Sequence, residues 1–319
     1  MTLQKLEPQS TADDRQLLQQ ALAEIETVVL GKSRQVRLAM ACLIGQGHLL
    51  IEDLPGMGKT TLAQALARVL GFDFNRIQFT SDLLPADVIG ASIFNVKEHR
   101  FEFQPGPVFT QLLLADEINR ATPKAQSALL EAMEERQVTV DGESRELPAP
   151  FFVIATQNPQ HQLGTFALPE SQLDRFLMRI ELGYPDRQAE RALLSGQNPR
   201  RRLEQLNCAL PLPSLQRLQQ LAESLHLSEP LLDYIQRLVE FSRSSDDFDY
   251  GLSPRGALAL VQAAKAWALI EQRDYVVPED VQAVLPSVAE HRLRGDYDCT
   301  GHKGISLTRQ LLDSVEVLE

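Results

Sequence analysis

The chain has 319 residues, of which 44% are hydrophobic and 23% are charged, a composition typical of globular proteins. Its 43 acidic residues outnumber its 31 basic residues, giving a net charge of -12, so it offers no overall attraction to nucleic acid or anionic membranes. No apolar run approaches the ~20 residues of a membrane span, and the polar, acidic start does not resemble a signal peptide. We therefore expect a cytoplasmic protein without a membrane span and with nucleic acid disfavoured as a partner.

The order of apolar segments predicts two domains after a short flexible tail at residues 1–12. From residue 13 to 185, apolar strands alternate with helical patterns, which is typical of a parallel sheet with helices on both faces. After Tyr184-Pro185 only helical patterns follow, so residues 186–319 are expected to form a smaller all-α lid domain. The expected strands are residues 48–52, 75–80, 112–116, 151–156 and 176–182.

Two features predict local structure with a clear physical reason. Ser253-Pro254 places a good N-cap residue before a proline at the first helical position, which predicts a helix start there. Asp141-Gly142, between QVTV and ESREL, is a strong signal for a hairpin turn at residues 137–149.

The segment EDLPGMGKTT, residues 52–61, lies between an expected strand and an expected helix, which is the setting of a phosphate-binding P-loop. Asp53 occupies the position of the first glycine of the strict motif, and we expect Asp to tolerate unusual backbone angles there. In this interpretation Lys59 binds the β- and γ-phosphates of ATP and Thr60 binds Mg²⁺. The expected phosphate-binding residues are Pro55, Gly56, Met57, Gly58, Lys59, Thr60 and Thr61.

Polar side chains also follow two other apolar strands. Asp116 and Glu117 end LLLADE, and Asn158 follows FFVIAT. Because ligands bind at the carboxyl ends of parallel strands, these residues are expected to converge with Lys59. Asp116 would then hold Mg²⁺, Glu117 would polarise the attacking water, and Asn158 would orient that water.

Together, LADEINRATPKAQSALLEAMEERQVTVDG, ATQNP and LPESQLDRFLMRI resemble the MoxR family of AAA+ ATPases over most of residues 25–319. The resemblance implies an insertion between Asp82 and Pro107, an adenine-side turn at Gly31, a sensor-2 arginine at Arg255 and an arginine finger at Arg175. The finger would act on the ATP of a neighbouring subunit. Spacing alone favours a surface ion pair for Arg175 and Arg179 alike, and only the resemblance singles out Arg175. Arg120 is a further candidate for an intersubunit contact, with structural packing as the alternative.

The family resemblance also implies a homo-oligomer, expected to be a hexamer, that remodels or matures protein clients, including metal insertion and complex assembly. A partner with a von Willebrand factor A domain is expected. The insertion carries Phe94, Phe101 and Phe103 beside Lys97 and Arg100, either for contact with a client or partner or for packing of the hairpin onto the sheet. Two alternatives remain: a nucleic-acid translocase or chelatase-like motor, and a nucleotide-switched scaffold without turnover.

Overall fold

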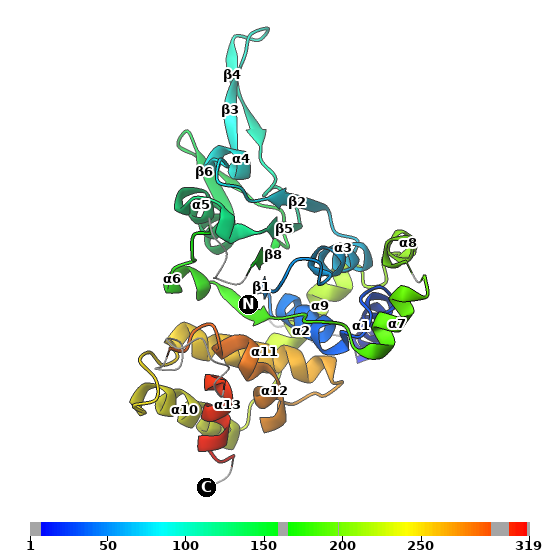
Figure 1. The fold of residues 1–319 in the computed structure, drawn as a ribbon, viewed down its shortest axis with the longest axis vertical. Coiled ribbons are helices and arrows are strands. Elements are labelled where there is room, and N and C mark those ends of the chain that lie inside the picture. The colour runs from blue at the N-terminus through cyan, green and yellow to red at the C-terminus, as the bar shows by residue number, and fades with distance from the viewer. Residues whose placement is uncertain (1–7, 159–164, 197, 295–305, 318–319) are drawn as a thin grey trace.

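The computed structural model describes residues 8–158, 165–196, 198–294 and 306–317 of the chain. At its centre lies a five-stranded parallel sheet in the order β2-β5-β8-β1-β9 (Figure 1). All five predicted strands are confirmed, with some ends moved by one or two residues. They are β1 (His48–Glu52), β2 (Phe74–Gln78), β5 (Leu112–Asp116), β8 (Phe152–Gln157) and β9 (Phe176–Ile180).

Both faces of the sheet are buried, as the near-continuous apolar strands predict. Along β5, Leu112 and Leu114 pack into one core together with the buried sides of α1, α2 and α3, whereas Leu113 and Ala115 face a second core built on α5. This alternation follows from the two-residue period of a strand. The covering helices are α1 (Pro8–Val28), α2 (Ser33–Ile44), α3 (Lys59–Leu70) and α5 (Pro123–Glu135).

The start of α1 differs from the expected tail at residues 1–12. Helix α1 already begins at Pro8, because proline is well tolerated in the first turn of a helix, where its missing N–H has no intrahelical partner. Residues 1–7 lie outside the described part of the chain.

Two hairpins extend from the sheet domain. The expected insertion consists of α4 (Pro85–Ile89) followed by β3 (Gly90–Asn95) and β4 (Arg100–Pro105), an arm that projects away from the lid helices (Figure 1). The second hairpin, β6 (Gln137–Val140) and β7 (Glu143–Glu146), is confirmed. Its turn has Asp141 at φ 54° and Gly142 at φ 80°, the left-handed geometry that an Asp-Gly turn favours.

Only helices follow β9 in the described residues. They are α7 (Arg187–Leu194), α8 (Pro199–Gln205), α9 (Leu212–Ser224), α10 (Glu229–Ser244), α11 (Pro254–Ile270), α12 (Pro278–Ala289) and α13 (Leu307–Ser314). Helices α8 and α9 contact the core helix α1, so the domain boundary at residue 185 remains a prediction. The predicted helix start is confirmed, since the Ser253 side chain accepts a hydrogen bond from Gly256 N.

Besides α8 and α9, the lid meets the sheet domain through α11 and α12. Helix α11 packs on α2 and α9, and α12 packs on β9. Gln262 of α11 donates to the Gly45 carbonyl, in the turn that leads into β1. The lid is therefore attached below the amino end of β1 (Figure 1). Within the described ranges, no helix combines the length and apolar character needed to cross a membrane.

Candidate active site

The P-loop connects β1 to α3. Gly56 and Gly58 have φ values of 85° and 95°, and a Cβ at either position would meet no atom within 4 Å. The left-handed geometry requires glycine, and the open space beside both residues leaves room for phosphate groups at the N-terminus of α3. Pro55 and Met57 belong to the same loop, and Met57 packs against the core.

Lys59 is only 8% exposed and donates from Nζ to the Asp53 carbonyl over 2.5 Å. Burial lowers the pKa of Lys59, and the carboxylates of Asp53, Asp116 and Glu117 oppose that shift. An ammonium group withdrawn from water beside an open loop is suited to binding an anion. The loop thus combines a charge with backbone donors.

Asp53 holds the P-loop through its side chain and does not adopt the unusual backbone angles that we expected. Its φ is not positive, so our reason for accepting Asp at this position was wrong. Instead, Oδ2 accepts a hydrogen bond from Gly183 N at 2.6 Å and Oδ1 accepts one from Leu54 N at 2.7 Å. Asp53 therefore joins the P-loop to the segment that follows β9.

Asp116, at the carboxyl end of β5, is almost buried and both of its carboxylate oxygens are engaged. Thr156 Oγ1 donates to Oδ1 over 2.6 Å. Arg76 on β2 donates to Oδ2 from Nη2 over 2.6 Å and from Nε over 3.2 Å. Asp116 therefore offers an ionised carboxylate at the sheet edge, with Oδ2 paired to Arg76.

Glu117 lies at the start of η1 (Ile118–Arg120) in a left-handed conformation, φ 55°. Its carboxylate accepts hydrogen bonds from Asn158 Nδ2 at 3.2 Å, Gln78 Nε2 at 2.9 Å and Arg120 Nη1 at 3.1 Å. A non-glycine residue in this backbone region is uncommon and often marks a functional site. The structure thus brings Glu117 and Asn158 together at the carboxyl edge of the sheet, as expected.

A cavity of about 220 Å³ extends from the P-loop toward the end of α1 and the turn that follows it. Gly31 lies beside it at φ 68°, and a Cβ there would come within 2.8 Å of Ala189 Cβ. Glycine is therefore required both by the backbone angle and by the close approach of α7. The cavity is lined by Val28, Val29, Leu30, Lys32, Gly56, Met57, Gly58, Thr61, Pro185, Leu193 and Pro199.

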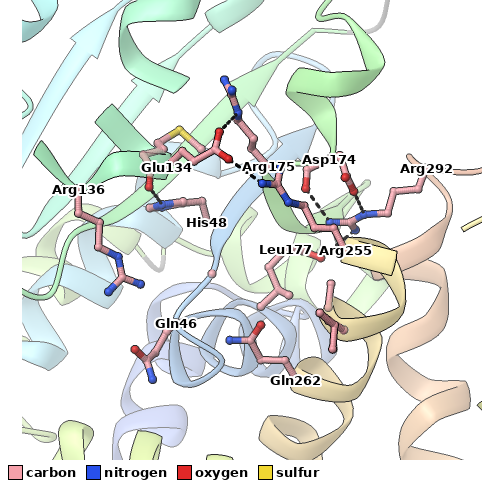
Figure 2. Close-up of a pocket in the computed structure, with 14 residues that line it drawn as sticks. Gln46, His48, Glu134, Arg136, Asp174, Arg175, Leu177, Arg255, Gln262 and Arg292 are labelled. Atoms are coloured by element: carbon pink, nitrogen blue, oxygen red, sulfur yellow. Dashed lines mark hydrogen bonds and ion pairs between the residues drawn. The ribbon is translucent and has the colours of Figure 1, made fainter. Parts of the chain in front are cut away.

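Arg175 and Arg255 lie at a different place, together with Glu134 of α5 (Figure 2). Arg175 Nε and Arg255 Nη2 each lie 2.6 Å from a Glu134 oxygen. They line a cavity of about 260 Å³ with Gly47 and His48, the residues at the amino end of β1. The P-loop follows the opposite, carboxyl end of β1. A strand of five residues is about 16 Å long, so the two ends of β1, and the sites beside them, are separated by about that distance.

The sensor-2 role of Arg255 remains a prediction, and the structure places Arg255 away from the P-loop of its own chain. The lid packs beneath the amino end of β1, through α11 on α2, and this carries Arg255 away from its own P-loop. The other two arginines have partners at the carboxyl edge. Arg179 donates to Glu52 at 3.0 Å, and Arg120 donates to Glu117.

Four residues near these sites were not identified from the sequence: Arg76, Gln78, Thr156 and Glu134. Arg76 and Gln78 are two residues apart on β2 and therefore lie on the same face of the strand. This periodicity could have identified them, had it been known that β2 lies beside β5. Thr156 lies one residue before the end of β8, a strand already singled out for Asn158. For Glu134 we find no local signal, because it is one of several glutamates at the end of α5.

The P-loop follows β1, the polar residue Asn158 follows the neighbouring strand β8, and the carboxylate pair ends β5, the next strand along. This sheet order, together with a helical lid, defines a P-loop ATPase of the AAA+ class. A family model described as the ATPase family associated with various cellular activities matches residues 48–178, and an AAA lid domain model matches residues 240–305.

The relatives narrow the class further. Chaperone MoxR1 of Mycobacterium tuberculosis is 41% identical, covering 88% of this chain and 76% of the relative, and protein MoxR of Paracoccus denitrificans is 36% identical, covering 86% and 87%. YeaC of Bacillus subtilis is 44% identical over 94% of this chain and 95% of its own length. A crystal structure from Cytophaga hutchinsonii, provisionally described as an ATPase, superposes with a TM-score of 0.86 at 36% identity and covers 98% of both chains. The chain belongs to the MoxR family of AAA+ ATPases.

Proposed function

We propose that this protein binds ATP with Mg²⁺ and hydrolyses it, and that it uses the cycle to remodel or mature protein clients. The observation that carries the proposal is the contact of Glu117 with Asn158 at the sheet edge where the buried Lys59 and Asp116 also lie. This arrangement provides a phosphate-binding cation, a metal-binding carboxylate and a base with a polar partner.

In this mechanism the P-loop amides and Lys59 bind the phosphates. Glu117 accepts a proton from the attacking water, and Asn158 orients Glu117 and that water. Thr60 and Asp116 would hold Mg²⁺, which when bound neutralises phosphate charge. The fit is supported by the oxygen donors of a hydroxyl and a carboxylate, which Mg²⁺ favours. Arg76 occupies Asp116 Oδ2 and would compete with the metal ion for that oxygen.

The remaining positive charge is proposed to come from a neighbouring subunit of a ring, with a hexamer as the expected assembly. Arg175 and Arg255 would both act in this way, because they lie together at the end of the sheet remote from their own P-loop. An arginine supplied by a neighbour stabilises the charge on the transferring phosphoryl group and is worth about 10³- to 10⁵-fold in rate. A relative named as a chaperone supports the protein-remodelling part of the proposal.

The partner proposed for the remodelling of protein clients is a protein with a von Willebrand factor A domain. The β3–β4 arm is a candidate contact, because Phe101 is 71% exposed and Phe94 is 46% exposed while the two rings pack edge to face. Phe103 instead packs inward, beneath the Arg145 guanidinium at 4.1 Å. The arm thus both anchors itself and exposes aromatic surface.

The first test compares ATP binding and turnover in two variants. Lys59→Ala should lose most binding of a fluorescent ATP analogue, because it removes charge that pairs with ground-state phosphate, whereas Glu117→Gln should bind normally and hydrolyse ATP at least 100-fold more slowly. Lys124→Ala and Glu135→Gln, both exposed positions on α5, are the matched controls. Turnover of Glu117→Gln at the wild-type rate would refute the base assignment, and stimulation by DNA would favour the translocase.

The second test addresses the neighbouring subunit. Arg175→Ala should bind ATP normally and hydrolyse it slowly, and mixing it with Lys59→Ala should restore part of the activity. Restoration is expected because some interfaces in mixed rings pair an intact P-loop with an intact Arg175. Full activity of Arg175→Ala alone would rule out the mechanism across subunits.

A further inference from the structure

Glu134 connects two arginines that come from different parts of the fold. Arg175 lies between α6 (Glu170–Leu173) and β9, and Arg255 lies in the first turn of α11 in the lid. Each contributes one nitrogen at 2.6 Å from a different oxygen of the same carboxylate. About one third of the Glu134 side chain is exposed, with 30% for Arg175 and 51% for Arg255, so the cluster lies at the protein surface.

Arg175 contacts Glu134 in a way that leaves its two Nη atoms available to bind another group. The Glu134 contact is made by Nε, as an ion pair without an aligned hydrogen bond. Figure 2 shows the Nη end of Arg175 pointing away from Arg255. Among the described residues, no partner is found for either Nη atom of Arg175. Arg255 uses Nη2 for Glu134, and the described part of the chain provides no hydrogen-bond partner for its other donors. Both guanidinium groups can therefore bind a further anion while Glu134 holds them.

The segments that carry these arginines are fixed to each other from behind. Asp174, the residue before Arg175, accepts a hydrogen bond from Arg292 Nε at 2.6 Å and a longer one from Ser253 Oγ at 3.4 Å. Ser253 is also the N-cap of the helix that begins just before Arg255. The backbones of the two arginines are thus joined through Asp174, whereas their side chains meet only at Glu134.

Without a shared anion, two adjacent guanidinium groups repel each other and their long side chains sample many rotamers. A carboxylate with one oxygen for each group offsets the repulsion and selects one geometry. The pKa of Glu134 is lowered, mainly by the hydrogen bond from Arg255, with Arg175 also contributing. The carboxylate therefore remains ionised to lower pH than an ordinary glutamate.

We propose that Glu134 is a positioning residue that presents Arg175 and Arg255 as a pair to the ATP of the neighbouring subunit. This inference rests on the proposed function, because it assumes that the two arginines act across the subunit boundary. Glu134 itself does not contact the nucleotide in this account. Its contribution is geometric: a displacement of about 1 Å in a group that stabilises charge can cost about 100-fold in rate.

The experiment compares Glu134→Gln with Glu135→Gln, its exposed neighbour on the same helix, for which the described residues provide no ion-pair partner. Glutamine keeps one acceptor but loses the charge and can hold only one guanidinium. We expect kcat of Glu134→Gln to fall roughly 10- to 100-fold with the KM for ATP almost unchanged, because ground-state binding comes from the P-loop of the other subunit. Glu135→Gln should behave as wild type.

A purely structural role would not reproduce two further results. Mixing Glu134→Gln with Lys59→Ala should restore part of the activity, since the intact P-loop of the first can face the correctly held arginines of the second. In an Arg175→Ala background, Glu134→Gln should cost much less than it does alone. Glu134→Asp keeps the negative charge, but its side chain is one carbon shorter and cannot reach both arginines, so it should also lose activity. This variant provides a second measurement if Glu134→Gln folds poorly.

The outcomes separate the two proposals. A wild-type kcat for Glu134→Gln, with Arg175→Ala slow, would overturn the positioning role and leave the function across subunits intact. A higher kcat would also overturn it, because it would show that Glu134 withholds the arginines. Loss of activity that mixing does not restore would show that Glu134 acts within its own subunit. Full activity of Arg175→Ala would instead refute the function on which the inference rests.

Discussion

His48 couples protonation to folding, because its ring is buried in its neutral form. The Nδ1 atom accepts a hydrogen bond from Val153 N at 3.0 Å, and Nε2 is positioned to donate to the Met133 carbonyl at 3.2 Å. Burial lowers the pKa of His48 to about 4, whereas an unfolded histidine titrates near 6.5. Protonation in the fold would also remove the acceptor that Val153 uses.

The sign and size of the effect follow from this difference. Below pH 6.5 the unfolded chain binds a proton at this histidine and the folded chain does not, so stability is lost as the pH falls from about 6.5 to about 4. At pH 5 the loss attributable to His48 is about 2 kcal/mol. We expect His48→Asn to be less stable at pH 7 and to lose about 2 kcal/mol less than wild type between pH 7 and pH 5.

Urea unfolding of the nucleotide-free protein at pH 7 and pH 5 measures this difference, with the exposed His226→Asn as the control. The control should keep the pH dependence of the wild type. If His48→Asn and wild type lost the same free energy of unfolding between the two pH values, a neutral buried His48 would be the wrong description.

Two further predictions concern Asp116 and the β3–β4 arm. Arg76→Met frees Asp116 Oδ2, so ATP-analogue binding should reach half-saturation at an Mg²⁺ concentration lower by up to about fivefold. This is the equivalent of about 1 kcal/mol, the scale for an ion pair in which one partner, here Arg76, is half exposed. An unchanged or higher Mg²⁺ requirement would contradict competition at this oxygen. Replacing Lys97 and Arg100 with Ala should leave basal ATPase activity intact, because the exposed pairs of Arg100 with Glu98 and Glu102 contribute little to stability. The same change should alter turnover stimulated by a von Willebrand factor A partner, and an unaltered stimulated rate would remove the arm from that role.

The sequence by itself determined the features that depend on residues only a few positions apart in the chain. The strands follow from short apolar runs, the Asp141-Gly142 turn from left-handed backbone preference, and the start of α11 from the Ser253 cap. The candidate nucleotide site is of the same kind. Its residues follow strand ends, and the topology of a parallel sheet brings those ends to one edge.

The contacts between distant segments were decided only by the tertiary structure. Arg255 and Glu134 are separated by 121 positions, and their meeting depends on how α11 packs on α2, which no local pattern specifies. The pairing of Arg76 with Asp116 likewise requires β2 to lie beside β5 in register. The sequence determined which side chains carry charge. Which of those charges became partners was decided by the burial of apolar helix faces, because the hydrophobic effect that drives it is non-directional and is not specified by any local pattern of charged residues.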